Sequence, residues 1–187
     1  MKLEQIKFRG VLASERLILR KLTNEDRTKL FEIYTHEESA LYDDWIPFTD
    51  IKEADDMIVN SVTSFSEKSE IRYGIIDKES DTLVGSCGIF GFDDWNMKCT
   101  LFYQVHHLER NKGYASESVR LLLDYAFSEL EFNRLEAYIT PGNDSSIRVL
   151  EKNGFVREGL LREMEFYKDR YWDGILMAIL RKDYKPK

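Results

Sequence analysis

The chain has 187 residues, a length that fits one compact domain spanning residues 1–187. Hydrophobic residues make up 43% and charged residues 33%, a mixture typical of a soluble globular protein. The 27 Lys and Arg residues are outnumbered by 34 Asp and Glu residues, and the net charge of -7 argues against nucleic acid or an anionic membrane as the main partner. No segment approaches the roughly 18 apolar residues of a membrane span, and the N-terminus has no signal-peptide core, so we expect a cytoplasmic protein.

The first half of the chain predicts strands interleaved with two helices. Residues 23–34 begin at Thr23 or Asn24 and carry acidic residues in their first turn, which is the pattern of a capped helix. Residues 72–77 and 82–92 show the side-chain alternation typical of strands on either side of a turn, which predicts a β-hairpin. The expected elements are, in chain order, a strand over 16–20, a helix over 23–34, a helix from Ile51 or Ala54 to Phe65, and strands over 72–77, 82–92 and 98–107.

The second half predicts an alternation of helices and strands. A strand over 133–140 ends at Pro141. The short helix that follows begins at Asn143 or Asp144 and ends at Gly154. A helix over 117–130 precedes these elements, and a last strand over 171–180 follows them. Strands first, then an alternation of strand and helix, predict an α/β or α+β domain whose mixed sheet is covered by helices.

The two cysteines, Cys87 and Cys99, have no zinc-ligand spacing and no histidine or cysteine cluster nearby. We expect free thiols, with a disulfide across the hairpin as the less favoured alternative. No ligand cluster predicts a metal site.

The segment Arg110–Ala115 lies where a strand ends and a helix begins. Such a junction leaves several backbone N–H groups unpaired at the positive end of the helix dipole, so it favours an anion. Gly113 lets the backbone approach a ligand closely, while Arg110 and Lys112 add positive charge suited to a pyrophosphate. The segment matches neither the P-loop nor the three-glycine dinucleotide turn, so by itself it leaves open a helix that merely begins with glycine.

The motifs of the C-terminal half carry a family resemblance. They are, in order, RNKGYA (110–115), ESVRLLLDYAFSEL (117–130), NRLEAYI (133–139) and NDSSIRVLEKNGFVREG (143–159). The stretch from Cys99 to Leu180 resembles the GNAT acetyltransferases, in particular the branch of the ribosomal-protein N-terminal (alanine/serine) acetyltransferases. Weaker similarity extends over residues 16–26, 45–48 and 82–89.

The resemblance implies the GNAT acyl-CoA N-acyltransferase fold, a mixed and mostly antiparallel sheet flanked by helices. The sheet would splay between two parallel strands, here residues 99–105 and 133–139. Acetyl-CoA would be the co-substrate, with its pyrophosphate on the turn and its pantetheine arm in the slot between those strands. A backbone N–H of Gln104 or Val105 would polarise the thioester carbonyl. The residues implied in cofactor binding are Phe102, Tyr103, Gln104, Val105, Arg110, Asn111, Lys112, Gly113, Tyr114, Ala115, Asn143 and Ser146.

Two side chains are implied in proton transfer. Glu165 matches the position of the general base in the ribosomal-type branch, and Ser146 matches that of a serine that protonates the leaving thiolate. The residue patterns leave alternatives open, because Glu165 lies in a run of surface charges and Ser146 or Asn143 could serve at a helix cap. Glu136 is the reserve base.

Several other side chains are candidates for the site. His106 and His107 precede the anion turn and rank below Glu165 as bases. Asp43 and Asp44 beside Trp45 suggest an acidic and aromatic lip for a cationic amine. The remaining aromatic candidates, for which ordinary packing is the commoner role, are Phe48, Trp95, Tyr103, Tyr138, Tyr167 and Trp172.

The expected activity is direct transfer of the acetyl group from acetyl-CoA to an amine in a ternary complex. The expected acceptor is a protein or peptide N-terminal α-amine, whose pKa of about 7.7 to 8.0 requires only modest help from a base. A polyamine, an aminoglycoside or an amino-acid derivative is the alternative acceptor. The other functional class is a module that binds acetyl-CoA without catalysis. These patterns do not fix the oligomeric state and are compatible with a homodimer.

Overall fold

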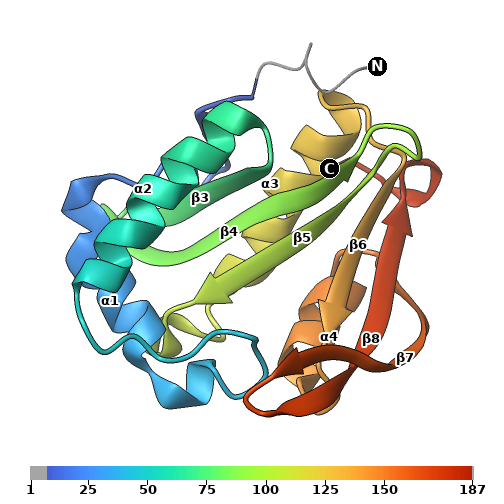
Figure 1. Ribbon diagram of the computed structural model, residues 1–187. Helices are drawn as coiled ribbons and strands as arrows, with labels where there is room; N and C mark the ends of the chain where they lie inside the picture. The colour runs from blue at the N-terminus through green and yellow to red at the C-terminus, as the bar shows by residue number, and fades with distance from the viewer. Residues whose placement is uncertain (1–7, 187) are drawn as a thin grey trace.

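The structure is a computed structural model that describes residues 8–186. Its eight strands form one sheet in the order β1-β2-β3-β4-β5-β6-β8-β7 (Figure 1). All neighbouring strands are antiparallel except β5 and β6, which are parallel. The strands are β1 (Val11–Ala13), β2 (Leu17–Arg20), β3 (Glu70–Asp77), β4 (Thr82–Asp93), β5 (Lys98–Val105), β6 (Arg134–Ile139), β7 (Val156–Tyr167) and β8 (Arg170–Leu180). The mixed, mostly antiparallel sheet expected from the sequence is confirmed.

Two pairs of helices cover opposite faces of this sheet (Figure 1). The first pair is α1 (Arg27–Thr35) and α2 (Lys52–Glu67), and the second pair is α3 (Tyr114–Ser128) and α4 (Asp144–Lys152). The larger apolar core lies under α3 and includes Cys87 and Cys99, which are free thiols as predicted. None of the helices within residues 8–186 combines the length and the apolar content that a membrane span requires.

The helix boundaries follow the predicted caps. Thr23 and Asp26 form a capping box at a 3-10 turn that leads into α1, and Arg20 holds the Asp26 carboxylate at 2.7 and 2.8 Å. Asn143 caps α4, because its side chain accepts a hydrogen bond from the Ser146 N–H. Gly154 follows α4 with a φ of 89°, the left-handed conformation that suits a glycine after a helix.

Two strands were not predicted, β1 and β7. β7 is an edge strand with largely exposed side chains, and two irregularities in its pairing with β8 break the alternation that marks a strand. The turn between β7 and β8 places Lys168 and Asp169 at positive φ, 50° and 59°. Tight hairpin turns of this kind usually contain Asn or Gly, so the sequence carried no recognisable hairpin signal.

The parallel strands β5 and β6 separate soon after they meet. Their ladder joins Lys98–Thr100 to Arg134–Glu136 and ends there, although β5 continues to Val105 and β6 to Ile139. Figure 1 shows the two strands close together at one end and far apart at the other. This divergence is the splay that the resemblance implied.

Candidate active site

The slot between β5 and β6 offers main-chain groups to a ligand. The His106 N–H donates to the Val84 carbonyl of β4 at 2.8 Å, and the register places Val105 and Gln104 in the next two positions of the same ladder. Alternate residues of an antiparallel strand direct their main-chain groups to the same neighbour. Gln104 therefore directs its N–H towards β4, whereas Tyr103 and Val105 direct theirs into the slot, where an extended ligand can pair with them.

The predicted anion turn leads directly into α3. Gly113 is the N-cap residue of α3 and has a φ of 89°, while Asn111 also lies in the left-handed region with a φ of 64°. Among the described residues no side chain caps this helix start, in contrast to α4 with its Asn143 cap. The first N–H groups of α3 are therefore available to an anion, and the exposed turn gives it access. The local geometry fits a pyrophosphate.

The two basic side chains of this turn have protein partners. Arg110 donates to the Ser39 hydroxyl at 2.5 Å and so reaches the connection between α1 and α2. Lys112 forms an ion pair with Glu109 at 2.8 Å, which raises the pKa of the lysine. The main-chain N–H groups of the turn, rather than these side chains, are the principal free donors.

The start of α4 faces β5. The Tyr103 hydroxyl donates to the Ser146 carbonyl at 3.1 Å, which joins the slot-lining strand to the first turn of α4. The Asn143 side-chain oxygen accepts from the Ser146 N–H at 3.2 Å and from the Ser145 hydroxyl at 2.9 Å. The cap alternative for Asn143 is thus observed, and it fixes the backbone of Ser146 at the edge of the slot.

Three carboxylates gather between the α1–α2 connection and β7. Burial and the negative charge of Asp44 raise the pKa of Asp43 to about 6, and the same two causes raise the pKa of Glu165. The positive charges of Lys168 and Arg110 act on Asp43 in the opposite direction. The acidic lip, defined here as Asp43, Asp44 and Glu165, therefore favours an added cation, because a positive charge would relieve the mutual repulsion.

The β7–β8 hairpin holds the lip in place. Lys168 donates to the main-chain carbonyls of Ala40 and Asp43. Directly after β6, the Thr140 hydroxyl donates to the Tyr42 carbonyl at 2.8 Å and contacts the Tyr167 hydroxyl at 3.1 Å. Lys168 and Thr140 were not predicted as site residues, since the role of each depends on contacts more than 90 positions away.

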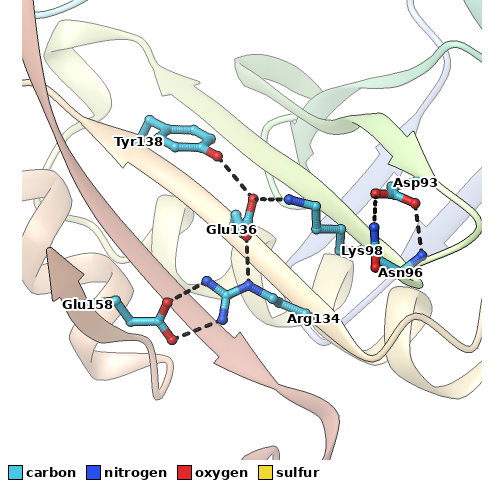
Figure 2. A network of polar contacts seen from close by, with 7 residues as sticks. All are labelled: Asp93, Asn96, Lys98, Arg134, Glu136, Tyr138 and Glu158. Atoms are coloured by element: carbon cyan, nitrogen blue, oxygen red, sulfur yellow. Dashed lines mark hydrogen bonds and ion pairs between the residues drawn. The ribbon is translucent and has the colours of Figure 1, made fainter. Parts of the chain in front are cut away.

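Glu136 lies in a polar network at the closed end of the slot, on the first residues of β5 and β6. Figure 2 shows its carboxylate between Arg134 at 2.7 Å, Tyr138 at 3.0 Å and Lys98 at 3.3 Å. Arg134 also holds Glu158 at 2.9 and 2.5 Å. Although burial opposes it, this set of donors lowers the pKa of Glu136. A carboxylate with a low pKa and occupied oxygens suits a structural role better than that of a base.

Two further candidates, Trp95 and His106, lie at opposite ends of β5. Trp95 is 90% exposed in the β4–β5 turn, which Asp93 closes by accepting from Asn96 (Figure 2), so it lies at the opposite end of β5 from Val105. His106 is buried and accepts from the Leu108 N–H at 3.2 Å.

Burial, followed by neighbouring imidazoles, lowers the pKa of both His106 and His107. The ring of His107 stacks on that of His36 with centroids 3.9 Å apart. Residues 8–186 contain no group of three or more His, Cys, Asp or Glu side chains placed to hold a metal ion.

The aromatic side chains near the lip form two stacks. Tyr34 of α1 contacts Trp45 and Phe48, with ring centroids 5.0 and 5.2 Å apart. Tyr167 and Trp172 stack at 5.0 Å on the β7–β8 hairpin. Both stacks flank the acidic lip.

Comparison with known proteins agrees with this geometry. Residues 16–156 match the family described as "Acetyltransferase (GNAT) domain". N-acetyltransferase p20 of Bacillus licheniformis is 38% identical over 173 residues, which cover 92% of this chain and 97% of that protein.

Solved structures show the same fold. A GNAT-family acetyltransferase from Bacillus anthracis superposes with a TM-score of 0.83 and 25% identity, and covers 92% of this chain and 99% of that one. Spermidine N-acetyltransferase from Vibrio cholerae in complex with CoA and spermine superposes with a TM-score of 0.78 and 22% identity, over 91% of this chain and 99% of that one.

Proposed function

Since the chain belongs to the GNAT acetyltransferase family and is an acetyl-CoA-dependent N-acetyltransferase, we propose that its acceptor is the N-terminal α-amine of a protein or peptide. The observation that carries this proposal is a groove of about 410 Å³ between α2 and β3. Phe48 lines this groove and also belongs to the stack on Tyr34 that includes Trp45. The acceptor residues that follow the α-amine would extend from the lip past this stack into the groove.

The charge of the groove supports a basic peptide. Its lining includes Glu53, Asp56 and Glu70, and Arg72 is the only cation among the described residues that line it. Arg72 is paired with Glu70 at 2.8 Å and lies over the Phe102 ring at 4.3 Å, so its charge is already compensated. Together with the acidic lip, the groove therefore presents excess negative charge to the acceptor.

Acetyl-CoA supplies an activated thioester to which the amine adds. The turn Arg110–Ala115 would hold its pyrophosphate through main-chain N–H groups, and β5 would hold its pantetheine arm as an added strand would. Of the two N–H groups considered for the thioester carbonyl, the register favours Val105 over Gln104, because only Val105 directs its N–H into the slot. Phe102 directs its N–H towards β4 as Gln104 does, so it would contribute through its side chain, which packs under Arg72 of the groove.

Glu165 would act as the general base through a water molecule, and Ser146 would return a proton to the leaving thiolate. The raised pKa of Glu165 brings it closer to that of an α-amine, which reduces the cost of the proton transfer. Ser146 is held next to Tyr103, whose hydroxyl is bonded to the Ser146 carbonyl. Glu165 lies on β7, so the edge strand contributes directly to the proposed chemistry.

A polyamine is the second candidate acceptor. The acidic lip would suit it equally, and a spermidine N-acetyltransferase is among the structures of the same fold. The two acceptors differ in what they require beyond the amine, because only a peptide uses the groove between α2 and β3.

The test is a competition in which acetyl-CoA is offered with an equimolar mixture of N-terminal peptides and spermidine. Mass spectrometry then locates the acetyl group. We expect peptides with basic residues after the free α-amine to be modified first, and the reaction to slow when Asp56 is changed to Lys in the groove. Preferred acetylation of spermidine would contradict the proposed acceptor, and no product from any amine would favour a module that only binds acetyl-CoA.

A further inference from the structure

Arg16 reaches from the residue before β2 to the start of α3. Its Nε and Nη2 donate to Glu117 Oε2 at 2.9 and 2.5 Å, and its Nη1 donates to the Lys112 carbonyl at 3.2 Å. The other carboxylate oxygen of Glu117 accepts from the Ser14 hydroxyl at 2.6 Å and from the Arg16 N–H at 3.4 Å. One side chain therefore ties a strand, the anion turn and the first turns of a helix together.

These contacts orient the anion turn. The carbonyl of Lys112 and the N–H of Gly113 belong to one planar trans peptide unit, so they point in opposite directions. Because Arg16 holds the carbonyl on its own side, the Gly113 N–H faces away from the guanidinium. The guanidinium also lies against the turn itself, since a Cβ added at Gly113 would be 3.3 Å from Arg16 Nη2.

Arg16 also neutralises a charge that would oppose an anion. Glu117 lies in the first turn of α3, and its side chain is only 20% exposed. A carboxylate at this position competes with a bound anion for the positive end of the helix. The ion pair with Arg16 cancels the negative charge and leaves the N–H groups of the turn to the ligand.

We infer that Arg16 is a positioning residue that fixes the CoA pyrophosphate turn from the side opposite to the ligand. The inference rests on the proposed assignment of that turn to the pyrophosphate. It predicts that loss of Arg16 weakens ligands that carry a pyrophosphate and spares those that lack one.

The test compares acetyl-CoA with S-acetylpantetheine, which has the same thioester arm without the pyrophosphate and the nucleotide. In Arg16→Met we expect the calorimetric Kd for CoA to rise about tenfold, equivalent to about 1.4 kcal/mol. The kcat/KM for acetyl-CoA should fall by the same factor, while that for S-acetylpantetheine stays within twofold. Arg16→Lys, which keeps the charge but not the fork of donors, should give an intermediate Kd.

Arg20→Met is the matched control. It removes the arginine–carboxylate pair with Asp26 at the other end of β2, without touching the anion turn. Its Kd for CoA should equal that of the unaltered protein.

Two results in Arg16→Met would overturn the inference. One is a Kd for CoA within twofold of the unaltered value, and the other is an equal fall of kcat/KM for acetyl-CoA and for S-acetylpantetheine. Should Arg16→Met not fold, the same comparison is made with Arg16→Lys, whose unchanged Kd for CoA would also overturn it. If the unaltered protein itself fails to bind CoA, the proposed function fails, and the inference fails with it.

Discussion

Replacement of Asp43 by asparagine should stabilise the protein in a way that depends on pH. Burial and the charge of Asp44 raise the pKa of Asp43 from 3.8 to about 6. The folded protein therefore keeps a proton on Asp43 between these values, whereas the unfolded chain releases it. As the pH rises through this window, Asp43 lowers the free energy of unfolding, and the full penalty is present above pH 6.

The size of the effect follows from the shift. A difference of about two pKa units corresponds to roughly 3 kcal/mol, since each unit is 1.36 kcal/mol. An asparagine side chain cannot ionise, so Asp43→Asn should exceed the unaltered protein by only about half a kcal/mol at pH 4 and by up to roughly 3 kcal/mol at pH 7. Asp44→Asn removes only the repulsion and should give a smaller gain over the same window.

Urea unfolding followed by tryptophan fluorescence between pH 4 and pH 8 measures these differences. A gain that is constant across this range, or a loss of stability at pH 7, would refute the electrostatic description of the acidic lip. The same charge should matter for function, because a cationic amine would relieve the penalty on binding. Asp43→Asn should therefore raise the KM for the acceptor while it leaves the Kd for CoA unchanged.

Three further substitutions test the site. Gly113→Val should weaken CoA binding by at least about tenfold, because a β-branched residue resists a φ of 89°. Gly91→Val is the control, since it introduces similar strain at a φ of 61° away from the turn. Equal affinity of the two variants for CoA in calorimetry would refute the role of the turn. Glu165→Gln should lower kcat about 100-fold on the upper plateau of the pH profile and abolish the rise of the rate with pH that ionisation of Glu165 causes; full activity on that plateau would transfer the role of base elsewhere. Glu136→Gln should lower the free energy of unfolding by about 1 to 3 kcal/mol with little effect on kcat, and the reverse pattern in paired denaturation and rate measurements would restore Glu136 as a base.

Local signals in the sequence were sufficient for most of the fold. Thr23, Asn143 and Gly154 marked helix ends through their own side chains or backbone preferences, and the structure confirms all three. The hairpin of β3 and β4 was equally evident from its alternation. β7 was missed, because an exposed edge strand that turns at Lys168 and Asp169 lacks both a buried face and a turn signature.

In the candidate site, too, features set by consecutive residues were predictable, and features set by contacts between distant residues were not. The uncapped start of α3 was predictable because its free N–H groups belong to consecutive residues. The assignment of Glu136 to an ion-pair network was not predictable, since Lys98 approaches it from β5 and its partner Arg134 is held by Glu158 of β7. The contact of Arg16 with Lys112 escaped notice for the same reason, because 96 positions separate the two residues.

The most direct test of the proposed function is a calorimetric titration of the protein with acetyl-CoA, followed in the same sample by thiol release on addition of N-terminal peptides. We expect saturable binding of one acetyl-CoA per chain and release of one thiol for each peptide acetylated. Absence of binding would contradict the proposed function, because the turn Arg110–Ala115 would then be only the start of a helix.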